Sequence, residues 1–136
     1  MSGEVILFAE DEVQQLKQMQ ALLEAQGYRV LGAKNGVEAI DLFRRHKNNI
    51  ALVVLDIGMP KLNGWDAFQK MKKETPQLKI VVATAYATPQ VRSGMARGEL
   101  HGLFIKPYRV DIFLARISEL IRARVIPAVF SSSLTE

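Results

Sequence analysis

Apolar residues gather in five short runs along the chain, each five to seven residues long and rich in branched side chains. Continuous apolar runs of this length are typical of strands that are buried on both faces of a sheet. The strands predicted from these runs are 5–9, 29–33, 51–55, 79–85 and 102–106.

Between these runs, apolar positions recur at intervals of three or four residues, which predicts one buried face on each of several helices. These positions are Val13, Leu16, Met19 and Leu23; Ile40 and Phe43; Phe68 and Met71; and Phe113, Ile117, Leu120 and Ile121. Gly27 predicts the end of the first helix, Asn35-Gly36 the start of the second, and Thr75-Pro76 the end of the third. A fourth helix near 89–97 has the weakest pattern.

Strands that alternate with helices predict an α/β fold, in which a parallel sheet is covered by helices on both faces. Five such units indicate a doubly wound, five-stranded parallel sheet with strand order 2-1-3-4-5 and five helices. In sheets of this kind, ligands bind beyond the carboxyl ends of the strands. The residues that follow the strands are therefore the candidates for a functional site.

Composition narrows the classes of protein that fit. A chain of 136 residues that is 49% hydrophobic predicts one domain with its own core. No apolar run approaches the roughly 18 residues of a membrane span, and segment 1–12 lacks the basic start of a secretory signal, so we expect a cytoplasmic protein without membrane contact. The net charge of +4 is small for a nucleic-acid-binding protein. Because cysteine is absent, a metal would be held by oxygen or histidine, although His46 and His101 are both predicted to be surface residues.

Five polar residues follow or end the predicted strands: Glu10, Asp11, Asp56, Thr84 and Lys106. Three carboxylates brought together repel one another, and a divalent cation relieves that repulsion. Mg2+ prefers oxygen ligands and is often completed by a phosphate, so the set predicts Mg2+ and phosphoryl chemistry. Asp56 follows the most apolar strand and is the predicted nucleophile, which would form an acyl phosphate. Glu10 and Asp11 could in addition cap the first helix.

With these residues the chain resembles the receiver domain of two-component response regulators over residues 4–124, followed by a C-terminal tail or linker stub at 125–136. Each matching motif is short, and their order and intervals together carry the resemblance. The motifs are Glu10-Asp11, Asp56 within LVVLDIGMPKLNGWD, Thr84-Ala85 and Lys106-Pro107.

The resemblance implies roles for individual residues. Mg2+ would be bound by Glu10, Asp11, Asp56 and the backbone carbonyl of Gly58. Asp56 would accept a phosphoryl group from the phosphohistidine of a sensor histidine kinase or a phosphotransfer domain. Thr84 and Lys106 would contact that phosphoryl group, and Pro107 would follow Lys106 through a cis peptide bond.

The function implied by the resemblance is a phosphorylation-dependent switch. Its state would be relayed through the fourth helix, fifth strand and fifth helix to a downstream effector protein or an attached domain. Such a domain catalyses its own phosphorylation and dephosphorylation, yet it is classed as a regulator rather than a conventional enzyme unless it belongs to a hybrid histidine kinase. Two architectures stay open: a stand-alone receiver, or the receiver of a hybrid histidine kinase, which the resemblance favours. Whether the protein forms a homodimer stays open too.

Two residues depart from the family pattern, and the second of them keeps an alternative function open. Glu10 stands where Asp is commoner, which lengthens the reach to a metal by one methylene. Leu103 stands three residues before Lys106, where many family members carry a Tyr or Phe that rotates inward on activation. The alternative is a phosphorylation-independent interaction module. A flavodoxin-like cofactor binder is disfavoured, because acids rather than a phosphate-cradling loop follow the first strand.

Overall fold

A computed structural model describes residues 3–58 and 63–122. In chain order, the elements are β1 (Val5–Ala9), α1 (Val13–Ala25), β2 (Arg29–Ala33), α2 (Gly36–Arg45), β3 (Ile50–Leu55), α3 (Gly64–Glu74), β4 (Ile80–Thr84), α4 (Pro89–Ala96), β5 (Gly102–Ile105) and α5 (Val110–Arg122). The strands form one five-stranded sheet in the order β2-β1-β3-β4-β5, and all four pairings are parallel. The predicted fold class and strand order are confirmed.

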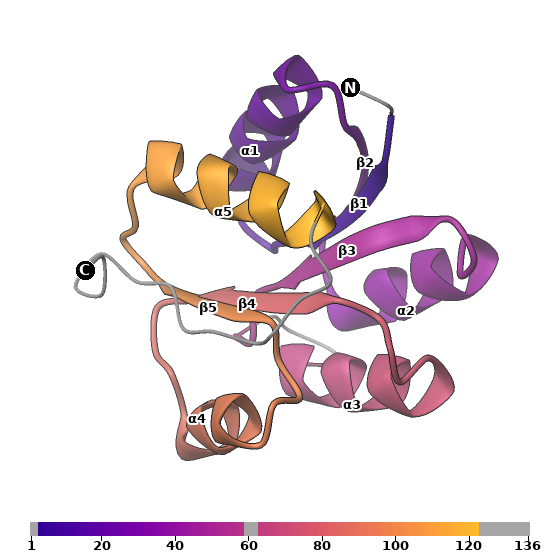
Figure 1. Ribbon diagram of the computed structural model, residues 1–136, viewed down its shortest axis with the longest axis vertical. Coiled ribbons are helices and arrows are strands. Elements are labelled where there is room, and N and C mark those ends of the chain that lie inside the picture. The colour runs from indigo at the N-terminus through magenta and orange to yellow at the C-terminus, as the bar shows by residue number, and fades with distance from the viewer. Residues whose placement is uncertain (1–2, 59–62, 123–136) are drawn as a thin grey trace.

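The helices form two layers around the sheet (Figure 1), with α1 and α5 on one face and α2, α3 and α4 on the other. Side chains alternate between these layers along each strand, as the pleat requires. In β1, Ile6 and Phe8 pack with α1 and α5, whereas Leu7 and Ala9 belong to the core on the opposite face. Because the central strands are buried on both faces, their sequences are apolar throughout.

Polar side chains begin three of the helices, and for α2 the start lies where the sequence predicted it. Asn35, Asn63 and Thr88 are the N-caps of α2, α3 and α4, and each accepts a hydrogen bond from a backbone N–H in the first turn. Gly27 follows the end of α1 with a φ of 101°, a conformation that other residues rarely adopt. Capping therefore fixes where the helices start relative to the strands.

Two predictions about single residues are wrong. Val13, which was expected in the core, is 45% exposed, because it is the first residue of α1 and directly follows the loop beyond β1. His101, which was expected on the surface, is half-buried between β4 and β5. The imidazole Nδ1 accepts a hydrogen bond from the Ile80 N–H at 3.2 Å, and the backbone N–H of His101 donates to the Ile80 carbonyl at 2.8 Å. The imidazole thus continues the pairing of the two strands.

None of the helices in residues 3–58 and 63–122 combines the length and apolar character needed to cross a membrane. The predicted tail at 125–136 and the loop residues Met59-Pro60 lie outside the described residues.

Candidate functional site

The residues predicted from the strand ends lie along one edge of the sheet, where neighbouring strands hold their backbones in place. The Glu10 N–H donates to the Ala33 carbonyl at 2.9 Å, and the Asp56 N–H donates to the Ala9 carbonyl at 3.1 Å. On the other side of β3, the Lys106 N–H donates to the Thr84 carbonyl at 2.8 Å. Each residue is therefore positioned by the strand next to its own.

Three carboxylates meet at this edge. Glu10, Asp11 and Asp56 each offer an oxygen that lies within 4.8 Å of the others. Glu10 is buried, Asp56 is half-buried and Asp11 is exposed, so the cluster is reachable from solvent on one side. Hard oxygen donors at this spacing suit Mg2+, which retains water in its remaining positions. The donor set therefore fits the metal that the sequence predicts.

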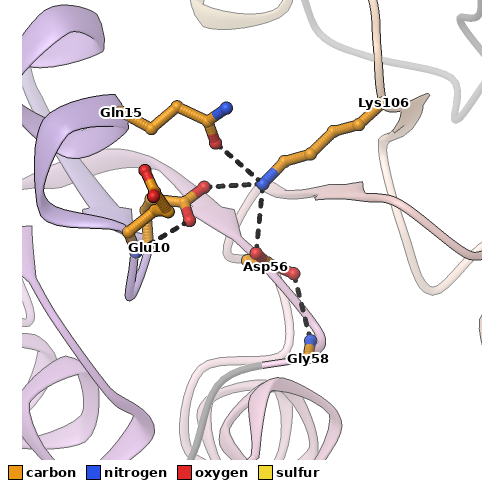
Figure 2. A network of polar contacts seen from close by, with 6 residues as sticks. Glu10, Gln15, Asp56, Gly58 and Lys106 are labelled. Carbon is orange, nitrogen blue, oxygen red and sulfur yellow. Dashed lines mark hydrogen bonds and ion pairs between the residues drawn. The ribbon is translucent and has the colours of Figure 1, made fainter.

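Lys106 reaches into the cluster from the end of β5 (Figure 2). Its Nζ lies 2.7 Å from Glu10 Oε1, 3.1 Å from Asp56 Oδ2 and 3.0 Å from Gln15 Oε1. Its side chain is only 19% exposed. An ammonium group has three hydrogens to donate, so these three acceptors satisfy all of them. The sequence did not identify Gln15, which lies in the first turn of α1.

The charge balance of the site is visible in the pKa of its groups. Burial raises the pKa of Glu10, although hydrogen bonds from Lys106 and from the backbone N–H of Glu12 act in the opposite direction. Burial by itself would lower the pKa of Lys106, but its hydrogen bond to Glu10 and its attraction to Asp56 outweigh that effect and raise it. One ammonium thus compensates the buried carboxylate only in part, which favours the binding of a further cation.

The loop after β3 orients the Asp56 carboxylate. The Gly58 N–H donates to Asp56 Oδ1 at 3.0 Å, which leaves Oδ2 directed to Lys106. Further along, the Gly64 N–H donates to the Ile57 carbonyl at 3.1 Å. A Cβ on Gly64 would lie 2.7 Å from Ile57 Cα and would also clash with the Asp56 carbonyl oxygen. Only glycine allows α3 to begin so close to the backbone of Asp56 and Ile57.

Two further residues lie as the sequence indicated. Thr84 ends β4 and is 4% exposed, and the peptide bond between Lys106 and Pro107 is cis. The capping role considered for Glu10 and Asp11 is wrong, because the N-cap of α1 is Glu12, which makes no side-chain cap bond. The metal-ligand role of the Gly58 carbonyl stays a prediction.

Comparison with known proteins places these observations in a family. Residues 6–118 match the model of the response regulator receiver domain, and the chain belongs to this family, whose members act in two-component signalling. It is 34% identical over 123 residues to the probable transcriptional regulator ycf27 of Porphyridium aerugineum, covering 90% of this chain and 50% of that protein. The chain therefore spans about half the length of that relative.

Other relatives match along most of their length. The polar-differentiation response regulator DivK of Brucella anthropi is 28% identical over 114 residues, covering 82% of this chain and 91% of DivK. Among solved structures, the non-phosphorylated HemR receiver domain of Leptospira biflexa is 33% identical with a TM-score of 0.80, covering 88% of this chain and 94% of that one. The response regulator TrrA of Thermotoga maritima, solved with Mg2+ and BeF, is 28% identical with a TM-score of 0.74, covering 88% of this chain and 99% of that one.

Proposed function

We propose that this receiver domain is a phosphorylation-dependent switch in which Asp56 accepts the phosphoryl group with the help of Mg2+. The donor is the phosphohistidine of a sensor histidine kinase or a phosphotransfer domain, and the metal ligands are Glu10, Asp11, Asp56 and the Gly58 carbonyl. The observation that carries this proposal is the meeting of three carboxylates within 4.8 Å, with the Lys106 ammonium on the second oxygen of Asp56.

The chemistry follows from the groups at the site. An Asp56 carboxylate oxygen forms a bond to phosphorus while the bond between phosphorus and the donor imidazole nitrogen breaks; that nitrogen keeps the electron pair and takes up a proton. Lys106 provides positive charge beside the reacting carboxylate, and the Thr84 hydroxyl donates to a phosphoryl oxygen. When bound, Mg2+ supplies the remaining positive charge and a coordination position for a phosphoryl oxygen.

A related structure supports the metal and phosphoryl part of the proposal. TrrA, which shares the fold at a TM-score of 0.74, was solved in complex with Mg2+ and BeF. The oxygen cluster at Glu10, Asp11 and Asp56 provides a donor set of the kind that Mg2+ prefers. We extend that binding to this chain on the strength of both observations.

The phosphorylated state would be passed on through the surface made by α4, β5 and α5. Leu103 is 2% exposed in the core and has no aromatic ring to rotate, so the change would travel through Thr84 and the segment between β4 and α4. The receiver unit would comprise residues 4–124, in a cytoplasmic protein, with an effector protein or an attached domain as its target and homodimerisation as one form of output.

A second candidate function is a phosphorylation-independent interaction module. The observation that favours it is the same buried Leu103, which replaces a side chain that couples phosphorylation to the surface in many receivers. The two functions differ in whether Asp56 is modified at all, so one experiment separates them.

That experiment is the intact mass of the protein after incubation with acetyl phosphate and Mg2+. We expect a gain of one phosphoryl group, which is lost when the metal is chelated and in Asp56→Asn. Asp41→Asn is the matched control, because Asp41 is an exposed acid on α2 that pairs with Arg45 away from the site. No mass gain, together with no binding of beryllofluoride and Mg2+, would replace the switch with the phosphorylation-independent module.

A further inference from the structure

The three acceptors around Lys106 differ in what else they do. Glu10 and Asp56 are carboxylates, and Gln15 offers a neutral amide oxygen from the first turn of α1. We propose that Gln15 is a positioning residue, which keeps the Lys106 ammonium at the site while Asp56 is phosphorylated. This inference rests on the proposed function and assigns Gln15 an influence on the rate at which Asp56 is phosphorylated.

The two carboxylates change partners during the proposed reaction. Both are metal ligands under the proposed function, and a cation bound to them competes with the Lys106 ammonium for the same oxygens. Asp56 also loses its negative charge density when one of its oxygens bonds to phosphorus. Gln15 neither carries a charge nor accepts the phosphoryl group, so its hydrogen bond to Lys106 can persist through each of these changes.

The distance between Gln15 and Lys106 allows the amide to hold the ammonium in place. The Nζ to Oε1 distance of 3.0 Å is that of a well-formed hydrogen bond to a charged donor. Lys106 has a long, flexible side chain that loses much rotamer freedom when it is fixed in one place. Gln15 is itself exposed, yet the Lys106 side chain is only 19% exposed, which limits how many water molecules could replace the amide.

The position of Gln15 in the fold also suits this role. Figure 2 shows the Gln15 side chain extending from α1 to the ammonium, on the side of Lys106 away from Gly58. The acceptor is therefore anchored to a helix, whereas Lys106 follows the end of β5. A helix-borne acceptor gives the ammonium a fixed reference that does not depend on the loop carrying Asp56.

The test compares Gln15→Met, which keeps the length of the side chain but removes its strong acceptor, with Gln14→Met. Gln14 is a neighbouring exposed residue on the same helix, so it controls for the effect of a methionine on α1. We expect Gln15→Met to slow phosphoryl uptake from acetyl phosphate by about three- to tenfold, the effect of losing one ordinary hydrogen bond, because Gln15 is exposed and water partly replaces its amide. Gln14→Met should match the wild type, and the melting temperatures of all three should agree.

A second readout does not depend on activity. Nitrogen-15 NMR of the Lys106 ammonium, with Mg2+ and beryllofluoride present, should show hydrogens that exchange slowly in the wild type and in Gln14→Met. In Gln15→Met that exchange should be markedly faster. Unchanged exchange in Gln15→Met would overturn the positioning role.

A double variant tests whether Gln15 acts through Lys106. In a Lys106→Met background, Gln15→Met should cause no further loss of rate, and an equal loss in both backgrounds would overturn the proposal. If the wild type takes up no phosphoryl group, the proposed function fails. The ammonium exchange of the metal-free protein then still decides whether Gln15 holds Lys106.

Discussion

The ionised Glu10 carboxylate is destabilised by its burial in the folded protein. Its side chain is only 4% exposed, and burial raises its pKa even though the Lys106 ammonium lies 2.7 Å away. A raised pKa means that the folded protein disfavours the ionised carboxylate relative to the unfolded chain. The ionised acid therefore reduces the stability of the metal-free protein near neutral pH, a cost that the proposed cation binding would offset.

Replacing that charge should consequently stabilise the metal-free protein. For Glu10→Gln we expect a melting temperature about 2–5 °C above that of the wild type without Mg2+, because a neutral amide is buried in place of a carboxylate while Lys106 keeps Asp56 and Gln15 as partners. The same variant should bind Mg2+ more weakly and gain less stability from added metal. Thermal unfolding with and without Mg2+ measures both effects, and a lower melting temperature in metal-free buffer would contradict the account of Glu10.

Parallel-strand geometry explains which site residues could be predicted from the sequence. Glu10, Asp56 and Lys106 each follow an apolar run, and parallel strands bring their carboxyl ends to one edge. Gln15 could not be found in this way, because it reaches the site from a helix, and a polar residue on α1 looks like any solvated position. Periodicity was also insufficient for Val13. Its spacing matches the buried face of α1, yet it is exposed because it is the first residue of the helix.

Directly before β5 lies a histidine whose hydrogen bond to β4 needs a neutral ring. His101 Nδ1 accepts the Ile80 N–H, which an imidazolium could not do. Burial lowers its pKa to about 4, and the positive charges of Lys72 and Lys79 add to that effect. The sequence did not reveal this role, since His101 lies between predicted elements with no periodic pattern around it.

This arrangement predicts how the stability of the protein depends on pH. Between an ordinary histidine pKa of 6.5 and the folded-state value of about 4, the unfolded chain binds a proton that the folded protein does not. His101 therefore stabilises the folded protein fully above pH 6.5. That stabilisation is lost as the pH falls to about 4, by on the order of 2 kcal/mol when the full shift is reduced for the partial exposure of the ring.

Denaturant unfolding at several pH values would measure this loss. His101→Asn should show a shallower decline between pH 6.5 and 4, because an amide oxygen can accept the Ile80 N–H without titrating. His46→Asn, which alters the other histidine of the chain, serves as the control and should decline like the wild type. Equal slopes for His101→Asn and the wild type would show that His101 does not govern this pH range.

At the scale of the whole molecule, the sheet edge and the proposed output surface are linked through α3. Gly64 begins this helix and is hydrogen-bonded to Ile57, one residue after Asp56. Trp65 follows directly, and its ring packs on Phe68 at 4.8 Å between ring centroids. A Cβ on Gly94 of α4 would lie 3.3 Å from the Trp65 ring. The indole therefore contacts α4 from the first turn of α3.

Trp65 is the single tryptophan of the chain, so its fluorescence reports on this junction alone. If Asp56 modification shifts α4 relative to α3, beryllofluoride with Mg2+ should change the Trp65 emission in the wild type, because the contact with α4 alters the exposure of the indole. Asp56→Asn should show no such change, which separates the response from nonspecific effects of fluoride or metal. An unchanged emission, with beryllofluoride binding verified by fluorine NMR, would mean that the signal does not pass between α3 and α4. The output would then have to leave the site through β5 and α5, on the side where Lys106 already connects the acids to the end of the sheet.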